Sequence, residues 1–295
     1  MIGYLCAYLR YYYPTEFVAA YLNNANNEDD IRNGTGLANQ LGVRVRPIQF
    51  RHSSAKYTPD KSTNTIYKGM SSIKFLNASI SDQLYAMRDQ TFDSFIDLLN
   101  VNPCDTRQTT ILIKLNYFSE FGKSQYLLDI YDLYCKYHDR KILQKDQCDF
   151  DRAFMLQFAT ETDKQYKLTD SDEFLKALCD QVSNRSITIK SYLDAQNEYL
   201  GYIDYVNPKA KGYGFVMSVD TKYSPKLTIY QLDTGRTDTF KMTKKDFSVS
   251  GIQEGSIIKF TYELRARSKM VDGKWVKDFN EKEPWIEKFV IKENI

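Results

Sequence analysis

The sequence predicts an α+β protein of several domains. We expect a mostly α-helical N-terminal part with a tandem helix-hairpin-helix-like region, followed by a C-terminal OB-fold β-barrel. Apolar residues recur at helical spacing over much of the first 198 residues, and the spacing changes to two near Gly201. Between Ile66 and Leu84, two short helix-like runs meet at a tight connection. At 295 residues, the chain is long enough for two domains.

Composition limits the function classes. Hydrophobic residues make up 42%, charged residues make up 26%, and the net charge is +2, so a nucleic-acid surface must be a local patch. The five cysteines are scattered, and with two histidines they show no zinc-ligand spacing. No run approaches the roughly 20 apolar residues of a membrane span. We therefore expect a cytoplasmic protein without membrane contact, whose chain holds no metal and no cofactor.

The first 65 residues combine helices with short strands. The first 25 read as helix, with Pro14 where a first helical turn tolerates it. The polar run "NNANNEDD" predicts a turn, and the next short helix ends at Gly42. "VRVRPIQF" alternates like an edge strand, and "RHSSAKYTPDKSTNT" predicts a loop or hairpin.

The stretch from Ile66 to Leu84 carries the hairpin signal. A strand ends at Gly69, a helix-like run covers 70–74, and a second begins at Ser79 after the connection Phe75-Leu76-Asn77. Such connections normally hold glycine, because bare backbone amides must approach a phosphate there. This connection has none, so it could be a DNA grip, a weakened grip or ordinary core.

Residues 93–198 are predicted to be helical. "DSDEFLKALCDQV" forms one helix, with Asp170 or Ser171 as its N-cap. Asp149 and Asp151 in "CDFD" would share one face of a strand, as a two-metal nuclease site requires. The helix expected directly after them favours N-terminal capping instead. Both histidines, His52 and His138, are expected in structural or surface roles.

From residue 199 onward the pattern indicates a barrel. Seven short strand-like runs are separated by turns, and a helix-like piece lies between the fourth and fifth, which fits an OB-fold. The alternative is another small barrel, such as an SH3-like one. This region carries 17 Lys and Arg against 13 Asp and Glu.

A single-strand-binding OB-fold needs a positive groove and exposed aromatic rings. Two basic loops of the barrel region could supply them, although their lysines could instead be a solvated rim, with Phe215 and Trp275 in the core. The candidates are Lys209, Lys211 and Tyr213 in "NPKAKGYGF", and Arg265, Arg267, Lys269 and Lys274 in "RARSKMVDGKW".

The order of the segments carries a resemblance. "AYLRYYYPTEFVAAYLNN" is similar to a segment in the fingers of the alpha subunit of bacterial replicative DNA polymerase III, a C-family polymerase. "LGVRVRPIQFRHSSAKY", "IYKGMSSIK" and "LIKLNYFSEFGKSQYLL" resemble later segments of that family in the same order. In the last of these Gly122 matches and Asn116 replaces a glycine. "AQNEYLGYI" resembles the segment before the family's OB domain.

The resemblance implies a division of the chain into four parts. Residues 1–65 correspond to the end of the fingers, 66–145 to the helix-hairpin-helix region, 146–198 to a helical connector and 199–295 to the OB domain. The family's palm, with its metal-binding aspartates, has no counterpart, so no catalytic site is expected in this chain. Met1, followed by a sequence like the middle of a domain, favours a piece of a larger protein.

The resemblance also implies binding of duplex backbone and of single-stranded template. The hairpin candidates are Lys68, Lys74, Asn77 and Lys114. Phe75-Leu76-Asn77 stands for the family's Gly-Val-Gly, and we expect Asn77 to adopt the left-handed conformation of a glycine. Because Phe75 keeps a phosphate further away than glycine does, we expect a weakened grip.

Three further expectations concern partners and alternatives. The implied partners are DNA, the remainder of a polymerase and a sliding clamp, although residues 146–201 hold no clear copy of the family's clamp-binding peptide. A non-catalytic module that docks onto the replisome is the alternative function. A nuclease that uses Asp149 and Asp151 is the third.

Overall fold

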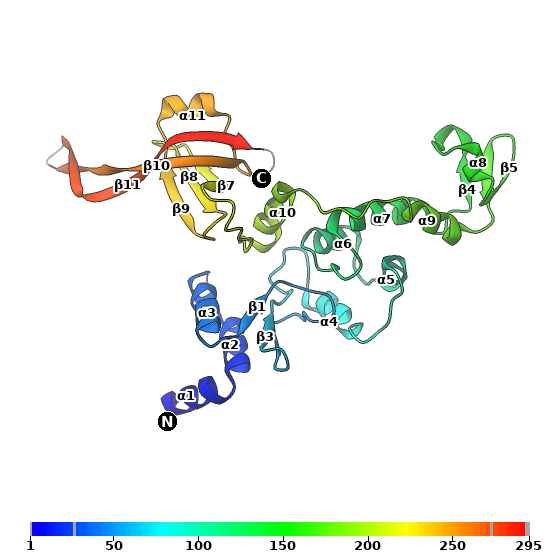
Figure 1. Ribbon diagram of the computed structural model, residues 1–295, viewed down its shortest axis with the longest axis horizontal. Coiled ribbons are helices and arrows are strands. Elements are labelled where there is room, and N and C mark those ends of the chain that lie inside the picture. The colour runs from blue at the N-terminus through cyan, green and yellow to red at the C-terminus, as the bar shows by residue number, and fades with distance from the viewer. Residues whose placement is uncertain (1, 26–27, 272–273, 293–295) are drawn as a thin grey trace. The chain divides into compact units, whose positions relative to one another are not determined.

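The computed structural model describes residues 2–25, 28–271 and 274–292 (Figure 1). The chain forms two compact units, Met1–Ile187 and Thr188–Ile295. The first unit contains helices and two small sheets, and the second contains a barrel. Within the described residues, no helix is both long enough and apolar enough to cross a membrane.

The first unit begins with helices packed on a small sheet. α1 (Ile2–Tyr12), α2 (Pro14–Asn23) and α3 (Glu28–Gln40) precede a sheet of order β1-β3-β2. Its strands are β1 (Arg44–Arg46), β2 (Thr58–Asp60) and β3 (Thr65–Tyr67). The predicted hairpin at 51–65 is confirmed, since β2 pairs antiparallel with β3. The turn predicted for "NNANNEDD" ends early, because α3 already begins at Glu28.

The hairpin region follows. It contains α4 (Ala78–Ala86), α5 (Phe95–Val101), α6 (Thr106–Lys114) and α7 (Ser124–Tyr137). Reciprocal capping boxes start two of them, between Ser94 and Asp97 for α5 and between Asp105 and Gln108 for α6. The helix predicted over residues 70–74 is wrong. Only successive turns form there, because Met70 and Ile73 accept i+3 hydrogen bonds and no helical ladder follows.

The end of the first unit departs most from the helical prediction. A sheet of order β4-β6-β5 forms from β4 (Ile142–Gln144), β5 (Ala159–Glu161) and β6 (Gln165–Leu168), next to η1 (Lys145–Gln147). The connector 146–198 is therefore not purely helical. α8 (Arg152–Met155) ends after one turn, because the chain returns to pair β5 with β6. α9 (Ser171–Cys179) begins at the predicted cap, Asp170.

The second unit begins with α10 (Ile189–Ala195) and a π-helical turn, η2 (Gln196–Leu200). The strand predicted over residues 199–206 is wrong. Gly201 ends the helical run in the left-handed region, at φ 77°. The Gln196 side-chain amide then donates to Asp204, which holds the chain in a loop before the first barrel strand.

The barrel has the strand order of an OB-fold. β7 (Tyr213–Asp220), β8 (Lys226–Gln231), β9 (Thr237–Lys241), β10 (Ile257–Val271) and β11 (Lys274–Lys292) close in the order β10-β11-β9-β8-β7. α11 (Lys244–Ser250) forms where the sequence predicts a helix-like piece, but it lies between the third and fourth strands and not the fourth and fifth, because the first predicted strand does not form. This topology favours the OB-fold over an SH3-like barrel. The two last predicted strands are one, β11.

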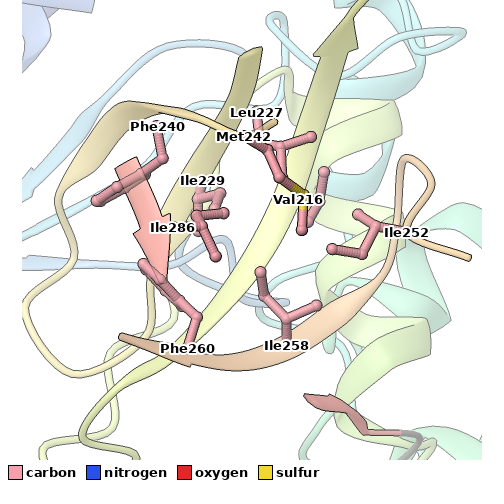
Figure 2. Close-up of a cluster of buried hydrophobic side chains, with 9 residues drawn as sticks. All are labelled: Val216, Leu227, Ile229, Phe240, Met242, Ile252, Ile258, Phe260 and Ile286. Atoms are coloured by element: carbon pink, nitrogen blue, oxygen red, sulfur yellow. The ribbon is translucent and has the colours of Figure 1, made fainter. Parts of the chain in front are cut away.

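Alternate residues of the barrel strands meet in a closed core (Figure 2). Leu227 and Ile229 of β8 point toward Phe240 of β9 and Ile258 of β10, and all four are buried. Phe215 is fully buried in a second cluster that reaches α10. The alternative reading of Phe215 as core is therefore confirmed.

Candidate nucleic-acid interface

The first hairpin turn has its left-handed residue at Phe75. Its φ is 72°, whereas Asn77 is extended at φ −113° and ψ 166°. The expectation of a left-handed Asn77 is therefore wrong. Asn77 is the N-cap of α4, and its Oδ1 accepts a 2.9 Å hydrogen bond from the Ile80 amide. This capping geometry requires an extended backbone.

Phe75 is held in this conformation from α6. A left-handed backbone costs an L-residue roughly 1–2 kcal/mol, and the chain places a bulky ring there. The Arg107 guanidinium carbon lies 3.3 Å from the centroid of the Phe75 ring. The Gln108 side-chain amide donates to the Phe75 carbonyl at 3.0 Å. Both contacts come from α6 and fix the turn.

Gly69 allows the turn to pack against the preceding loop. A Cβ at this position would lie 2.6 Å from the Lys56 carbonyl carbon. The amides of Met70 and Ser71 donate to the carbonyls of Ser54 and Ala55, each at 3.0 Å. The glycine that matches the family segment is thus required by close backbone contact.

The second turn lies at the end of α6. Asn116 has φ 60°, so it occupies the conformation of the glycine that it replaces. The next residue, Tyr117, is fully buried, and its hydroxyl has no hydrogen-bond partner among the described residues. Burial raises the pKa of Tyr117, and burial raises the pKa of the Cys104 thiol to about 12. The second turn therefore packs against buried, apolar surroundings.

One aromatic residue ties the loop before the first turn to the second turn. Phe50 is fully buried, with ring centroids about 6 Å from those of Phe92, Tyr117, Phe118 and Phe121. Arg51 beside it forms a 2.9 Å ion pair with Glu120 and donates to the carbonyls of Arg88 and Gln90 at 2.7 Å. These contacts connect the loop before the first turn to the loop after the second.

The structure separates the predicted hairpin residues. Lys74 and Asn77 are exposed and flank Phe75 in the first turn. Lys68 is half-buried after β3, and Lys114 is half-buried in the last turn of α6. Arg107, which the sequence reasoning missed, contacts Phe75 of the first turn directly.

In the barrel, the strand register relates loop 221–225 to Trp285 of β11. Asp220 pairs with Lys226, Lys226 with Lys241, and Lys241 with Trp285. This row crosses β7, β8, β9 and β11. Loop 221–225 between β7 and β8 therefore follows the same row as Trp285, whereas β10 leaves the barrel past the opposite end of β7, beyond the pair of Lys259 and Tyr213. In OB-folds, the loop between the first two strands and the loop between the last two bind oligonucleotides.

β10 and β11 extend beyond the barrel as a two-stranded arm, visible in Figure 1. β10 pairs with β7 at Ile257–Lys259, whereas its pairing with β11 continues to Val271. The register shifts after Ala266, so β11 bulges where Phe279 is 74% exposed.

A cleft of about 470 Å³ lies on the arm. The Arg265 guanidinium carbon is 5.0 Å from the Trp285 ring centroid, and Lys241 Nζ is 5.7 Å from it. Cations and rings thus alternate along one surface, which we call the arm cleft. Its charged and aromatic lining residues are Arg265, Lys277, Lys282, Glu283, Phe279 and Trp285.

The predicted barrel residues form two separate groups. Lys209 and Lys211 are exposed in the turn before β7, and Tyr213 is half-buried at its start. Tyr213 pairs with Lys259, which lies six residues, or roughly 20 Å of strand, before Arg265. Arg265 and Arg267 lie on the arm and pair with Glu263 at 2.6 Å and Glu281 at 2.9 Å. The side chains of Lys269 and Lys274 lie outside the described residues.

Loop 221–225 carries residues that the sequence reasoning missed. Tyr223 is 68% exposed, and Lys222 Nζ lies 5.6 Å from its ring centroid. These residues follow β7, the first barrel strand, whereas the sequence predicts the first strand over residues 199–206. Had β7 been recognised as the first strand, the loop after it would have been the natural candidate.

The aspartates considered for a nuclease site have a structural role at Asp151. Its carboxylate accepts a 3.0 Å hydrogen bond from the Ala153 amide and caps α8, as the capping interpretation predicted. Across residues 2–25, 28–271 and 274–292, no group of three or more His, Cys, Asp or Glu side chains is arranged to hold a metal ion.

Together these features define a chain that joins a helix-hairpin-helix region to an OB-type barrel. Residues 42–128 match the family model described as a helix-hairpin-helix motif. The chain is also similar to bacterial DNA polymerase III alpha subunits, so the resemblance inferred from the sequence is confirmed.

The similarity covers part of each protein. To DNA polymerase III subunit alpha of Mycobacterium tuberculosis (strain CDC 1551 / Oshkosh), the chain is 26% identical over 132 residues, which are 42% of this chain and 11% of that protein. To the Campylobacter jejuni subunit it is 28% identical over 129 residues, which are 41% of this chain and 11% of that protein. The match thus spans about a tenth of the length of these relatives.

Proposed function

We propose that this chain is the DNA-binding portion of a replicative polymerase similar to DNA polymerase III alpha. Its hairpin region holds duplex backbone, its barrel holds single-stranded template, and it contributes no catalytic residue or cofactor. The proposed partners are DNA, the remainder of a polymerase and a sliding clamp, in the cytoplasm. The arm cleft is the observation that carries the proposal, because it combines exposed cations with aromatic rings.

The proposed mechanism combines neutralisation of phosphates with stacking on bases. Lys277, Lys282 and Arg265 neutralise phosphates along the arm, while Phe279 and Trp285 stack on bases. Tyr223 and Lys222 extend the same surface from loop 221–225. Phosphate neutralisation releases counterions, so affinity falls with salt, whereas stacking depends little on salt.

The test is a salt titration with fluorescent single-stranded DNA and a primer–template duplex. The double variant Lys277→Ala/Lys282→Ala removes two arm cations and should lower the log–log salt slope on single strands by about 1.4. Lys244→Ala/Lys245→Ala removes the same charge from exposed positions on α11 and serves as the control. An equal fall of the salt slope in both double variants would overturn the proposal. So would a failure of the unaltered chain to bind DNA at low salt.

A second candidate function, protein docking, is favoured by a different cleft. This cleft, of about 720 Å³, is lined by residues of α5, α7 and α9 and by the rings of Phe92, Phe95 and Phe121. Its negative charge repels phosphate and suits a basic, partly apolar peptide. Its charged lining residues are Asp93, Asp97, Glu120, Asp172, Asp180 and Lys176.

The docking candidate is tested with a labelled lysine–leucine peptide and its glutamate–leucine counterpart. Asp172→Asn/Asp180→Asn should weaken binding of the basic peptide severalfold, with the glutamate peptide not binding. Asp82→Asn/Asp146→Asn, exposed outside the cleft, is the matched control. If both double variants weaken binding equally, the attraction is general charge and the cleft is not a docking site.

A further inference from the structure

Phe75 lies in the turn before α4 and takes the place of the first glycine in the Gly-Val-Gly of the similar family. About half of the residue (49%) is exposed to solvent at the tip of the turn. The ring prevents the close approach of a phosphate that a glycine would allow. Substitution for a glycine that binds phosphate therefore does not explain why phenylalanine occupies this position.

The immediate surroundings of Phe75 are cationic and ordered. Lys74 precedes it and is exposed, and the Arg107 guanidinium lies over the ring at 3.3 Å from its centroid. The Gln108 hydrogen bond to the Phe75 carbonyl fixes the backbone that presents the ring. Aromatic rings and guanidinium planes are the surfaces on which proteins stack unpaired bases.

The backbone conformation adds an independent observation. Phe75 is strained at φ 72°, whereas the second turn meets the same requirement with Asn116, which tolerates it. Gly or Asn would relax the first turn as well. A strained residue held from α6 by two contacts is the kind of outlier that points to function.

We propose that Phe75 and Arg107 form a stacking platform for an unpaired nucleobase, with Lys74 beside the adjoining phosphate. The first turn then binds a single strand or a frayed end, in place of the duplex backbone that a glycine-containing turn would hold. This inference rests on the proposed DNA-binding function and changes the substrate of its hairpin region.

The test compares four forms of the full chain: unaltered, Phe75→Tyr, Phe75→Leu and Phe75→Gly. The probe is a single-stranded oligonucleotide with one 2-aminopurine, whose fluorescence reports stacking, and a blunt duplex of the same sequence. Phe75→Tyr should retain affinity for the single strand. Phe75→Leu and Phe75→Gly should lose roughly fivefold to a hundredfold, the range measured for one stacked base, along with the fluorescence change. Phe75→Gly should also gain affinity for the duplex.

The outcomes distinguish this inference from the function on which it rests. If Phe75→Leu binds the single strand as well as Phe75→Tyr does, bulk rather than the ring matters, and the platform is wrong. If all four forms bind DNA equally, the proposed function stands and the platform fails. If the unaltered chain binds no DNA, the proposed function itself fails. Phe75→Leu retains an apolar side chain, so a loss of affinity in this variant, unlike one in Phe75→Gly, is not explained by a folding defect.

Discussion

The two hairpin turns meet one backbone requirement with residues of opposite character. Asn116 has φ 60° and Phe75 has φ 72°, so both lie in the region that glycine favours. Asparagine adopts this region at low cost, and phenylalanine does not. The second turn then continues into buried Tyr117, while the first exposes its ring. The second turn therefore replaces glycine with a residue that serves the backbone conformation. The first turn replaces it with a residue that also changes the surface.

The largest expected effect removes Phe50, the ring at the centre of the aromatic cluster around the second turn. Phe50→Ala should lower the free energy of unfolding by about 3–5 kcal/mol, because it leaves a cavity among four rings. Urea unfolding measures it. Phe92→Ala, which removes a half-buried ring from the edge of the same cluster, should cost clearly less. Equal costs would show that Phe50 is not the central support.

The next effect concerns the first turn alone. Gly69→Ala places a Cβ against the Lys56 backbone and should destabilise by about 1–3 kcal/mol. Gly36→Ala is the matched control, because that glycine lies in α3 with nothing within 4 Å of the new Cβ. It should stabilise by about 0.5–1 kcal/mol through helix propensity. A neutral Gly69→Ala would mean that the close backbone approach is not needed.

A smaller effect tests the second turn. Asn116→Ala should cost about 1 kcal/mol, because alanine adopts the left-handed region poorly, whereas Asn116→Gly should change stability little. Thermal and urea unfolding of both variants give the comparison. If alanine is tolerated as well as glycine, the second turn does not depend on this conformation.

The smallest effect is at Tyr117. Its buried hydroxyl lacks a partner among the described residues, so Tyr117→Phe should be neutral or stabilise by up to about 1 kcal/mol. Tyr230→Phe is the control, since the buried Tyr230 hydroxyl donates to the Tyr205 carbonyl at 3.1 Å, and losing this hydrogen bond should cost about 1 kcal/mol. A destabilising Tyr117→Phe would indicate that the hydroxyl binds a group such as a buried water.

The barrel and the hairpin region could be predicted because the sequence patterns that indicate them extend over many residues or depend only on neighbouring residues. Strand alternation, together with one interposed helix, specifies the OB-fold, and Asp170 and Asp151 are caps that depend on neighbouring residues. The β4-β6-β5 sheet could not be predicted in this way. Its strands have three or four residues, too few for alternation to show, and pairing with distant residues decides them.

The site could be predicted less well, for the same physical reason. The conformation of Phe75 is set by Arg107 and Gln108, more than 30 residues away, so the turn sequence alone pointed to Asn77. In the barrel, the sequence predicts a strand before β7 that does not form, so the predicted first loop holds Lys209, whereas the observed first loop holds Tyr223. The DNA contacts of all these residues stay predictions.

The arm of β10 and β11 has a further consequence. Because the two strands beyond the barrel pair with each other, each cross-strand pair can be deleted without removing a residue of the barrel core. Each deleted pair shortens the arm by roughly 3.3 Å. The length of the arm can thus be changed while every residue of the barrel core stays in place.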